Sequence, residues 1–182
     1  VAGRDLWLAP SAKITVEHRD ARVALQALPA APQFDVVFGD AFHDVGIPPH
    51  LVTAEFHREI RARLKPGGFY AVNVIEARHE PRFLFALVRT LMRDFAAVEV
   101  WVDDDELSQG ERLTYLVLAS DTATDTALVR STRFLHRAWV RLKPDQVRTR
   151  VTAADIPELT DDFAPVDRLM AQVLLHPEVG ER

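Results

Sequence analysis

The sequence predicts an α/β fold in which helices flank a mostly parallel sheet that ends in an antiparallel hairpin. Strand-like and helix-like segments alternate along residues 1–121. The runs 34–38 and 69–75 are almost continuously apolar, as expected of strands that are covered on both faces. With 182 residues, of which 48% are hydrophobic, the chain is long enough for one domain with a buried core.

The first segments resemble a helix end, a strand and a second helix. Residues 1–8 have the pattern of the last turns of a helix. Residues 14–18 are rich in β-branched side chains and predict a strand. Asp20 then stands where its carboxylate can cap a helix, and Pro29 marks the end of that helix.

A further helix is predicted after the strand 34–38 and a proline-containing loop. Thr53 is its expected N-cap, and Phe56 and Ile60 lie on one face at helical spacing. Residues 65–68, Lys-Pro-Gly-Gly, end the helix because proline cannot continue it and glycine supplies the turn. The strand 69–75 follows directly.

The next segments predict a helix and a strand pair. Residues 98–102 and 113–119 are short apolar strands close enough to form an antiparallel hairpin, and the acidic run 103–106 is expected in its solvated loop. The preceding helix opens at Glu80-Pro81. Its apolar face consists of Phe83, Leu84, Leu87, Val88, Leu91 and Phe95.

The character of the chain changes after residue 121. We expect residues 1–121 to form an incomplete α/β domain and 122–182 a helical extension packed on it. Within the extension, 127–140 is predicted as one helix and 167–175 as another, while 147–156 is ambiguous.

Composition excludes several classes of function. The net charge of −5 argues against non-specific nucleic-acid binding, which needs a basic face. The absence of cysteine excludes disulfides, thiolate catalysis and Cys-ligated metals. No apolar run approaches the roughly 20 residues of a membrane span, and the N-terminal residues lack a signal-peptide pattern. A cytoplasmic location is therefore predicted.

Asp40 is the leading functional candidate, because it ends the apolar strand 34–38. Ligands of open α/β sheets bind at the carboxyl ends of parallel strands. His43 and His50 lie in the following loop and either line a pocket or face solvent. The spacing of His43, Asp44 and His50 follows no metal-ligand pattern, so no metal site is predicted.

Three segments carry a resemblance to a known family. Residues 34–68, FDVVFGDAFHDVGIPPHLVTAEFHREIRARLKPGG, resemble the spermidine synthase-like (aminopropyltransferase) branch of the class I S-adenosylmethionine-dependent methyltransferase superfamily. The segment LKPGGFYAVNV at 64–74 is common in that superfamily. LTDDFAPVDRLM at 159–170 is similar to the ending of bacterial spermidine synthase-like proteins.

The resemblance implies a transferase that moves an aminopropyl group from decarboxylated S-adenosylmethionine to a diamine such as putrescine. It gives Asp40 the role of orienting and deprotonating the reacting amine. It places Asp20, with Ala21 beside it, near the adenine of the donor, and His43 and Asp44 on the acceptor side. Asp44 is displaced by one position from the family pattern and lacks the proline that follows there.

A second departure from the family is larger. The fold normally begins with a strand and a Gly-x-Gly turn that admits the cofactor, and this chain contains no Gly-x-Gly. The chain therefore resembles the C-terminal part of such a protein, and alone it is expected to bind the cofactor weakly or not at all. The superfamily sheet order, 3-2-1-4-5-7-6, would place the absent strands between 14–18 and 34–38. Either these two segments pair directly, or a second chain covers the gap, as in a homodimer.

Two other functions remain open at this stage. One is S-adenosylmethionine-dependent methyl transfer to another small acceptor. The other is a non-catalytic domain that serves a structural or partner-binding role. For Asp161 and Asp162, the family tail implies a position near the active site, whereas the local sequence allows a cap on the last helix.

Overall fold

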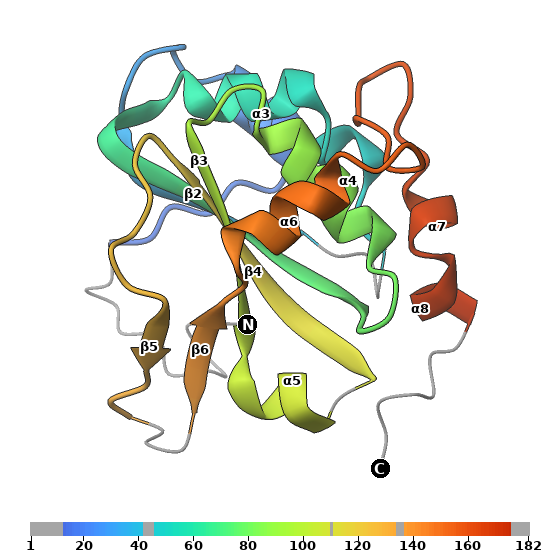
Figure 1. Cartoon of the computed structure of the whole chain (residues 1–182). Coiled ribbons are helices and arrows are strands. Elements are labelled where there is room, and N and C mark those ends of the chain that lie inside the picture. Colours follow the sequence, from blue (N-terminus) through green and yellow to red (C-terminus); the bar gives the residue numbers. More distant parts are fainter. Residues whose placement is uncertain (1–12, 42–45, 110, 134–136, 176–182) are drawn as a thin grey trace, which may run out of the picture.

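The computed structural model describes residues 13–41, 46–109, 111–133 and 137–175. Within them, six strands form one curled sheet in the order β1-β2-β4-β3-β6-β5 (Figure 1). β1 and β2 are parallel, and β4 lies antiparallel between β2 and β3. The strands are β1 (Phe34–Gly39), β2 (Leu64–Ala77), β3 (Ala97–Asp103), β4 (Arg112–Ser120), β5 (Leu128–Arg130) and β6 (Ala138–Arg141).

The helices of the first 100 residues begin where the sequence predicts. Asp20 caps α2 by accepting hydrogen bonds from the backbone N–H groups of Arg22 and Val23. Thr53 caps α3 by accepting one from Phe56. The helical segments are α2 (Ala21–Gln26), the 3-10 turn η1 (Pro49–Leu51), α3 (Ala54–Arg61), α4 (Arg82–Leu91), α5 (Asp104–Gln109), α6 (Pro144–Val151), α7 (Val166–Leu169) and α8 (Ala171–Leu175).

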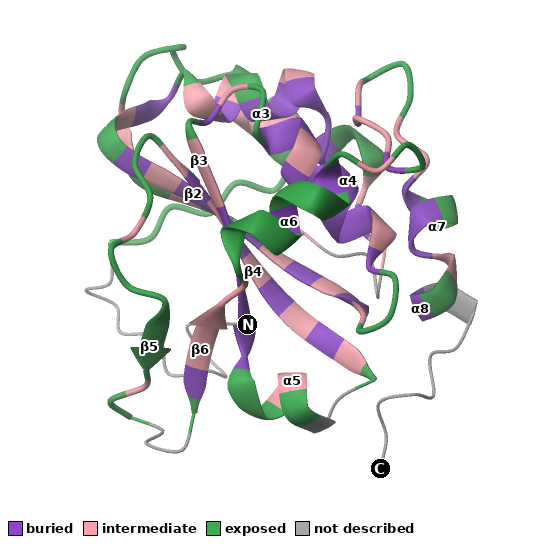
Figure 2. Cartoon of the chain, viewed as in Figure 1, coloured by how far each residue is buried: buried purple, intermediate pink, exposed green. Residues whose placement is uncertain are grey.

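The core lies between one face of the sheet and the helices α3 and α4. Alternate residues of β2 and β4, including Val72, Val74 and Val117, are buried in it. The predicted apolar face of α4 is buried, and Figure 2 shows this helix almost entirely in purple. No described helix is both long and apolar enough to cross a membrane.

The predicted strand at 14–18 is wrong. Residues 13–18 form no regular structure and are exposed, with Ile14 at 59% and Val16 at 64% of their full accessibility. Among the described residues, β1 pairs only with β2, so the first of the two alternatives, direct pairing of 14–18 with 34–38, is wrong, and a second chain beside β1 stays a prediction. A segment of high β-propensity does not form a strand when it has no neighbouring strand to pair with and no core to pack against. The predicted helix end at 1–8 lies outside the described residues.

The predicted helix at 127–140 is wrong as well. This segment contributes β5 and β6, which pair with each other, and β6 continues the sheet beside β3. Residues Trp139 and Val140 pair with Asp103 and Val102 of β3, so tertiary pairing outweighs the local helical pattern. The region 122–182 is therefore not purely helical. Figure 2 shows β5 exposed along its length.

The acidic run at 103–106 is not the expected loop, although β3 and β4 do form the predicted antiparallel pair. Asp103 ends β3, and residues 104–106 form the first turn of α5, where carboxylates are favoured by the positive end of the helix dipole. Asp103, whose side chain is fully buried, accepts a hydrogen bond from the backbone N–H of Asp105 and one from Arg137. The ambiguous stretch at 147–156 contains the second half of α6, and the predicted last helix is divided into α7 and α8.

Candidate functional site

A cleft of about 310 Å³ lies between β1, α2 and α3. Its polar lining side chains are Asp40, Asn73 and Tyr70, and the remaining lining is apolar. Such a cleft suits a ligand with a hydrocarbon stem and a polar or cationic head. The apolar side chains that line it are Leu25, Val37, Phe38, Ile47, Leu51, Val52, Phe56, Ile60 and Val72, together with Ala21 and Ala41.

Asp40 occupies the predicted position directly after β1. Gly39 pairs with Val72 across the two parallel strands, so the next residues, Asp40 and Asn73, lie side by side. The Asn73 side-chain amide donates a 2.9 Å hydrogen bond to Oδ1 of Asp40. Oδ2 of Asp40 makes no hydrogen bond with any described residue, and the side chain is exposed. This carboxylate can therefore accept a donor from a ligand in the cleft.

Asn73 was not predicted as a site residue. It is the single amide in the apolar run of β2, which is a detectable signal, because a polar residue in such a strand needs a partner. The sequence did not show that this partner is Asp40, since the pairing depends on the register of β1 and β2.

Below the strand end, Gly39 makes room for Tyr70. A Cβ at residue 39 would lie only 2.8 Å from the Tyr70 hydroxyl oxygen, so a larger residue would displace the phenol. Burial raises the pKa of Tyr70, which keeps its hydroxyl protonated. The Tyr70 ring packs 5.8 Å from that of His57, whose two nitrogens are buried and have no hydrogen-bond partner among the described residues. Burial lowers the pKa of His57 to about 3, so this imidazole is neutral at neutral pH.

The two residues predicted beside adenine have different surroundings. Ala21 lines the cleft, whereas Asp20 is bound by its own helix and by His50, whose Nε2 lies 2.7 Å from Asp20 Oδ2. The hydrogen bond from His50 is the main reason why the pKa of Asp20 lies below its usual value. The Asp20 side chain is 39% exposed and each carboxylate oxygen can accept two hydrogen bonds, so Asp20 retains capacity for a ligand.

The predicted acceptor-side residues His43 and Asp44 lie outside the described residues. Within the part of the chain that the structure describes, no three His, Asp or Glu side chains are grouped as metal ligands. His50, the other histidine of this loop, is engaged with Asp20.

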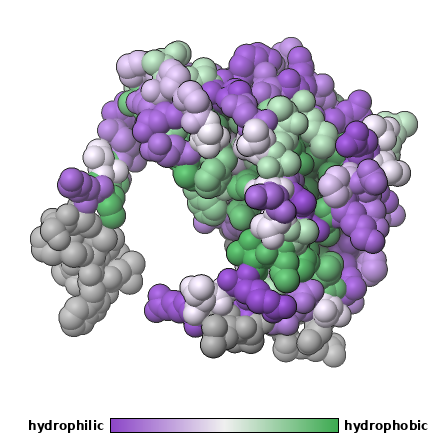
Figure 3. Space-filling model, turned by 60° about the vertical axis from the view of Figure 1, so that its left-hand side comes forward, coloured by the Kyte–Doolittle hydropathy of each residue, from purple (hydrophilic) through white to green (hydrophobic). Residues whose placement is uncertain are grey.

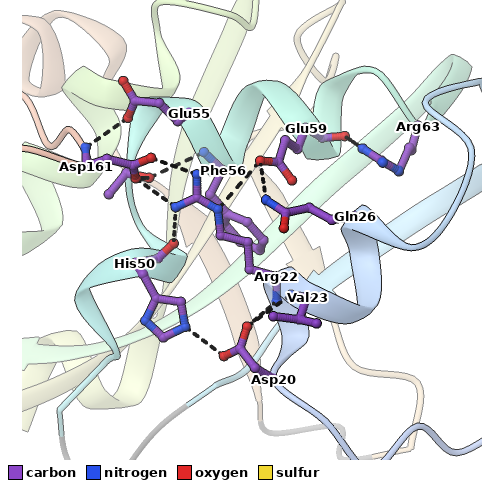
Figure 4. A network of polar contacts seen from close by, with 11 residues as sticks. Asp20, Arg22, Val23, Gln26, His50, Glu55, Phe56, Glu59, Arg63 and Asp161 are labelled. Carbon is purple, nitrogen blue, oxygen red and sulfur yellow. Dashed lines mark hydrogen bonds and ion pairs between the residues drawn. The ribbon is translucent and has the colours of Figure 1, made fainter.

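Asp161 lies against α2 and α3 rather than at the start of α7 (Figure 4). Its two oxygens accept hydrogen bonds of 2.7 and 2.8 Å from Arg22, and Oδ1 accepts a third, of 2.7 Å, from the Thr53 hydroxyl. Its backbone N–H donates to Glu55. The hydrogen bonds from Arg22 are the main cause that lowers the pKa of Asp161 to about 2. Asp161 thus ties the C-terminal region to the two helices that wall the cleft.

Comparison with known proteins shows similarity of fold to solved structures. No protein family model and no curated protein match the chain. Among solved structures, the chain is similar to a probable spermidine synthase from Corynebacterium glutamicum, with 22% identity and a TM-score of 0.63 over 81% of this chain. It is also similar to human methyltransferase-like protein 13 in complex with SAH, with 15% identity and a TM-score of 0.50 over 92% of this chain.

The matches cover 54% of the Corynebacterium protein and 71% of the human protein, so this chain spans about half the length of the first. Within this chain's sheet, the order β1-β2-β4-β3 agrees with the part 4-5-7-6 of the sheet order that the sequence resemblance implies. At these identities the likeness establishes the fold. The chain has a class I S-adenosylmethionine methyltransferase-like fold.

Proposed function

We propose that this chain supplies the acceptor side of an aminopropyl-transfer site. The observation that carries the proposal is Asp40, a carboxylate at the carboxyl end of a parallel strand, above an apolar cleft, with one oxygen that accepts no hydrogen bond from a described residue. A diamine such as putrescine has the matching chemistry, since it combines a four-carbon stem with cationic ends. The ammonium would pair with Asp40, and the stem would lie along the apolar lining.

Asp40 would act on the nucleophile of the reaction. An alkylamine, like a lysine side chain with its pKa of about 10.4, is protonated at neutral pH and has no free electron pair for attack. Asp40 would hold the ammonium and accept its proton for transfer to water, while Asn73 fixes the carboxylate. The freed nitrogen then forms a C–N bond with the aminopropyl carbon of decarboxylated S-adenosylmethionine. The C–S bond of the sulfonium breaks, and its electron pair leaves with neutral methylthioadenosine.

The residues of this chain fit only part of the donor. Ala21 in the cleft and the remaining acceptor capacity of Asp20 suit an adenine amino group. The chain has no Gly-x-Gly turn for the amino acid part of the donor. We therefore expect weak or absent donor affinity in this chain alone. Tight binding in a calorimetric titration would contradict this expectation.

Methyl transfer to another small acceptor is the second candidate, and the likeness to methyltransferase-like protein 13 supports it. The same carboxylate could orient an acceptor that attacks a methyl group. A third candidate, a structural or partner-binding domain, requires neither donor nor amine.

Thermal-shift titrations separate these candidates. S-adenosylmethionine, its decarboxylated form and methylthioadenosine would each be added with and without putrescine. Stabilisation by putrescine is the expected result, with at most a small further increase from the decarboxylated donor or methylthioadenosine, because the donor affinity of this chain is expected to be weak. A response to unmodified S-adenosylmethionine alone would defeat aminopropyl transfer in favour of methyl transfer. No response to any donor or to putrescine would favour the non-catalytic domain.

A further inference from the structure

A cavity of about 510 Å³ lies beside β3 and β6, away from the cleft at Asp40. Exposed apolar surface alone selects no particular ligand, and Figure 3 shows hydrophobic side chains gathered in the middle of the surface that it presents. This cavity differs, because it combines apolar walls with charged groups. Its charged lining side chains are Glu99, Arg141 and Arg148, and its apolar lining includes Met92, Val98, Leu142 and Val147.

The cavity forms where β6 stops running beside β3. β6 pairs with residues 101–103 of β3, and the N–H of Leu142 donates one further hydrogen bond, of 2.8 Å, to the Val100 carbonyl. Pro144 then begins α6, which leaves the sheet. The N–H and C=O groups of Val98 point to the same side as those of Val100, because these groups alternate along a strand, and β6 does not extend to them. The edge of β3 is therefore open to a ligand at Val98.

Glu99 holds Arg141 in a fixed position in this cavity. The Glu99 side chain is 8% exposed and accepts hydrogen bonds from Nη1 of Arg141, from Nε1 of Trp101 and from the backbone N–H and hydroxyl of Thr124. Nη1 of Arg141 also donates a 2.8 Å hydrogen bond to the Thr124 carbonyl. These donors satisfy the carboxylate of Glu99, so its effect is to orient the guanidinium of Arg141.

The remaining donors of Arg141 are available to a ligand. A guanidinium carries N–H donors on three nitrogens, and among the described residues only Nη1 of Arg141 has hydrogen-bond partners. Nε and Nη2 form one edge of the planar group, and such an edge matches the two oxygens of a carboxylate.

The cavity also carries an excess of positive charge. The guanidinium of Arg148, on α6, makes no hydrogen bond or ion pair with a described residue. Two guanidinium groups and one carboxylate leave the charged lining with one positive charge. A ligand with a single negative charge balances it.

We infer that this cavity binds a small organic monocarboxylate with an apolar body. The carboxylate takes the Nε–Nη2 edge of Arg141 through two parallel hydrogen bonds, and Arg148 supplies further attraction. The apolar body packs against Met92, Leu142 and Val147. Because Glu99 already orients Arg141, little side-chain freedom is lost on binding.

The proposed site is independent of the reaction proposed above. In the sheet order β1-β2-β4-β3-β6-β5, the strands β2 and β4 separate β3 from β1, which carries the cleft at Asp40. None of the residues that line the cleft lines the carboxylate cavity.

Octanoate tests the site directly, with octanol and octylammonium as matched controls that have the same chain and no negative charge. Binding to the 182-residue chain is followed by two-dimensional NMR of backbone amides and arginine Nε–H groups. We expect octanoate to shift the amide signals of Val98 and Thr124 and the Nε–H signal of Arg141 saturably, and to bind at least tenfold more tightly than either control. Equal binding of octanoate and octanol, or octanoate shifts confined to other residues, would overturn the inference.

Two exposed arginines provide a matched pair of variants. Arg148→Glu and Arg130→Glu change the net charge equally, but Arg130 lies on β5 and does not line the cavity. We expect Arg148→Glu to weaken octanoate binding at least tenfold and Arg130→Glu to change it less than twofold. Equal effects of the two variants would overturn the inference.

Arg141→Lys separates the planar edge from the charge. Lysine keeps a positive charge beside Glu99 but has no pair of parallel donors, so octanoate binding should again weaken at least tenfold. Unchanged octanoate affinity in a folded Arg141→Lys would contradict the proposed site. If this variant fails to fold, the comparison of Arg148→Glu with Arg130→Glu decides alone.

Discussion

Asp40 and Glu76 lie at the carboxyl ends of the neighbouring parallel strands β1 and β2, and their surroundings differ. Asp40 follows β1, is exposed, and among the described residues accepts a hydrogen bond from Asn73 alone. Glu76, near the end of β2, is 1% exposed and accepts hydrogen bonds from the backbone N–H groups of Ala77 and of Phe83 at the start of α4. Both positions meet the rule that functional groups gather at the carboxyl ends of strands.

The difference lies in unused hydrogen-bonding capacity and access. Both carboxylate oxygens of Glu76 accept hydrogen bonds from backbone N–H groups, and one of these bonds stabilises the start of α4. Asp40, at the end of a cleft, has one oxygen to which no described residue donates a hydrogen bond. A strand-end carboxylate is therefore a site candidate only when its neighbours leave it partly unsatisfied and solvent can reach it.

Glu76→Gln tests the structural side of this comparison and should have the largest effect on stability. Burial raises the pKa of Glu76 from 4.5 to about 7. The folded state then holds a proton that the unfolded state has lost, so wild-type stability falls as pH rises from about 4.5 to 7. Glutamine does not titrate. Urea unfolding should show the stability of Glu76→Gln rising relative to wild type by up to about 3 kcal/mol across this window. A difference independent of pH would contradict the buried-carboxyl account.

His57→Leu should show the opposite slope. The pKa of His57 is lowered from 6.5 to about 3, so acid protonates the unfolded state first and wild-type stability falls as pH drops below 6.5. Between pH 6.5 and 5, wild type should lose about 2 kcal/mol relative to His57→Leu in the same unfolding experiment. Equal acid sensitivity of the two proteins would show that the imidazole is not held neutral by burial.

Asn73→Ala tests whether the hydrogen bond from Asn73 holds the Asp40 carboxylate in the orientation that binds a diamine. Loss of one hydrogen bond of about 1 kcal/mol should weaken diamine binding by roughly fivefold, because Asp40 loses its fixed orientation. Calorimetric titration with putrescine measures this change, and Asn73→Gln should restore part of the affinity. Unchanged affinity in Asn73→Ala would show that Asp40 is positioned by other groups.

Asp161→Asn should have the smallest effect, although Asp161 has more hydrogen bonds than Asp40. Its side chain is 42% exposed, so solvent screens its pairing with Arg22, and the expected loss is below about 1 kcal/mol. Because the pKa of Asp161 is lowered from 3.8 to about 2, this stabilisation is present above pH 3.8 and disappears as pH falls towards 2. Urea unfolding of wild type and Asp161→Asn at pH 7 and at pH 2 measures the loss of stability and its disappearance in acid. A larger loss at pH 2 than at pH 7 would contradict the ion pair.

The sequence predicted those elements whose signals are local. Asp20 and Thr53 sit within three residues of the N–H groups that they cap, and the apolar face of α4 repeats at helical spacing. The carboxyl end of β1 could be placed because one apolar run stops at one acid.

The parts decided by distant pairing could not be predicted. Residues 14–18 have a β-rich pattern and 127–140 a helical one, yet it is the second segment that pairs with neighbouring strands, as β5 and β6. Likewise, Asp161 lies 139 positions from Arg22 in the chain, and Asn73 lies 33 from Asp40. No local pattern joins such partners, so the roles of Asn73 and Asp161 emerged from the structure.

Whether Asp40 binds an acceptor amine can be measured by two-dimensional NMR with putrescine. Asp35→Asn is the matched control, since Asp35 lies on the same strand, at its other end, and pairs with Lys65 outside the cleft. We expect putrescine to shift amide signals of cleft residues in wild type and in Asp35→Asn, and we expect Asp40→Asn to weaken binding at least tenfold. Equal binding by Asp40→Asn and wild type would contradict an acceptor-amine site at the end of β1.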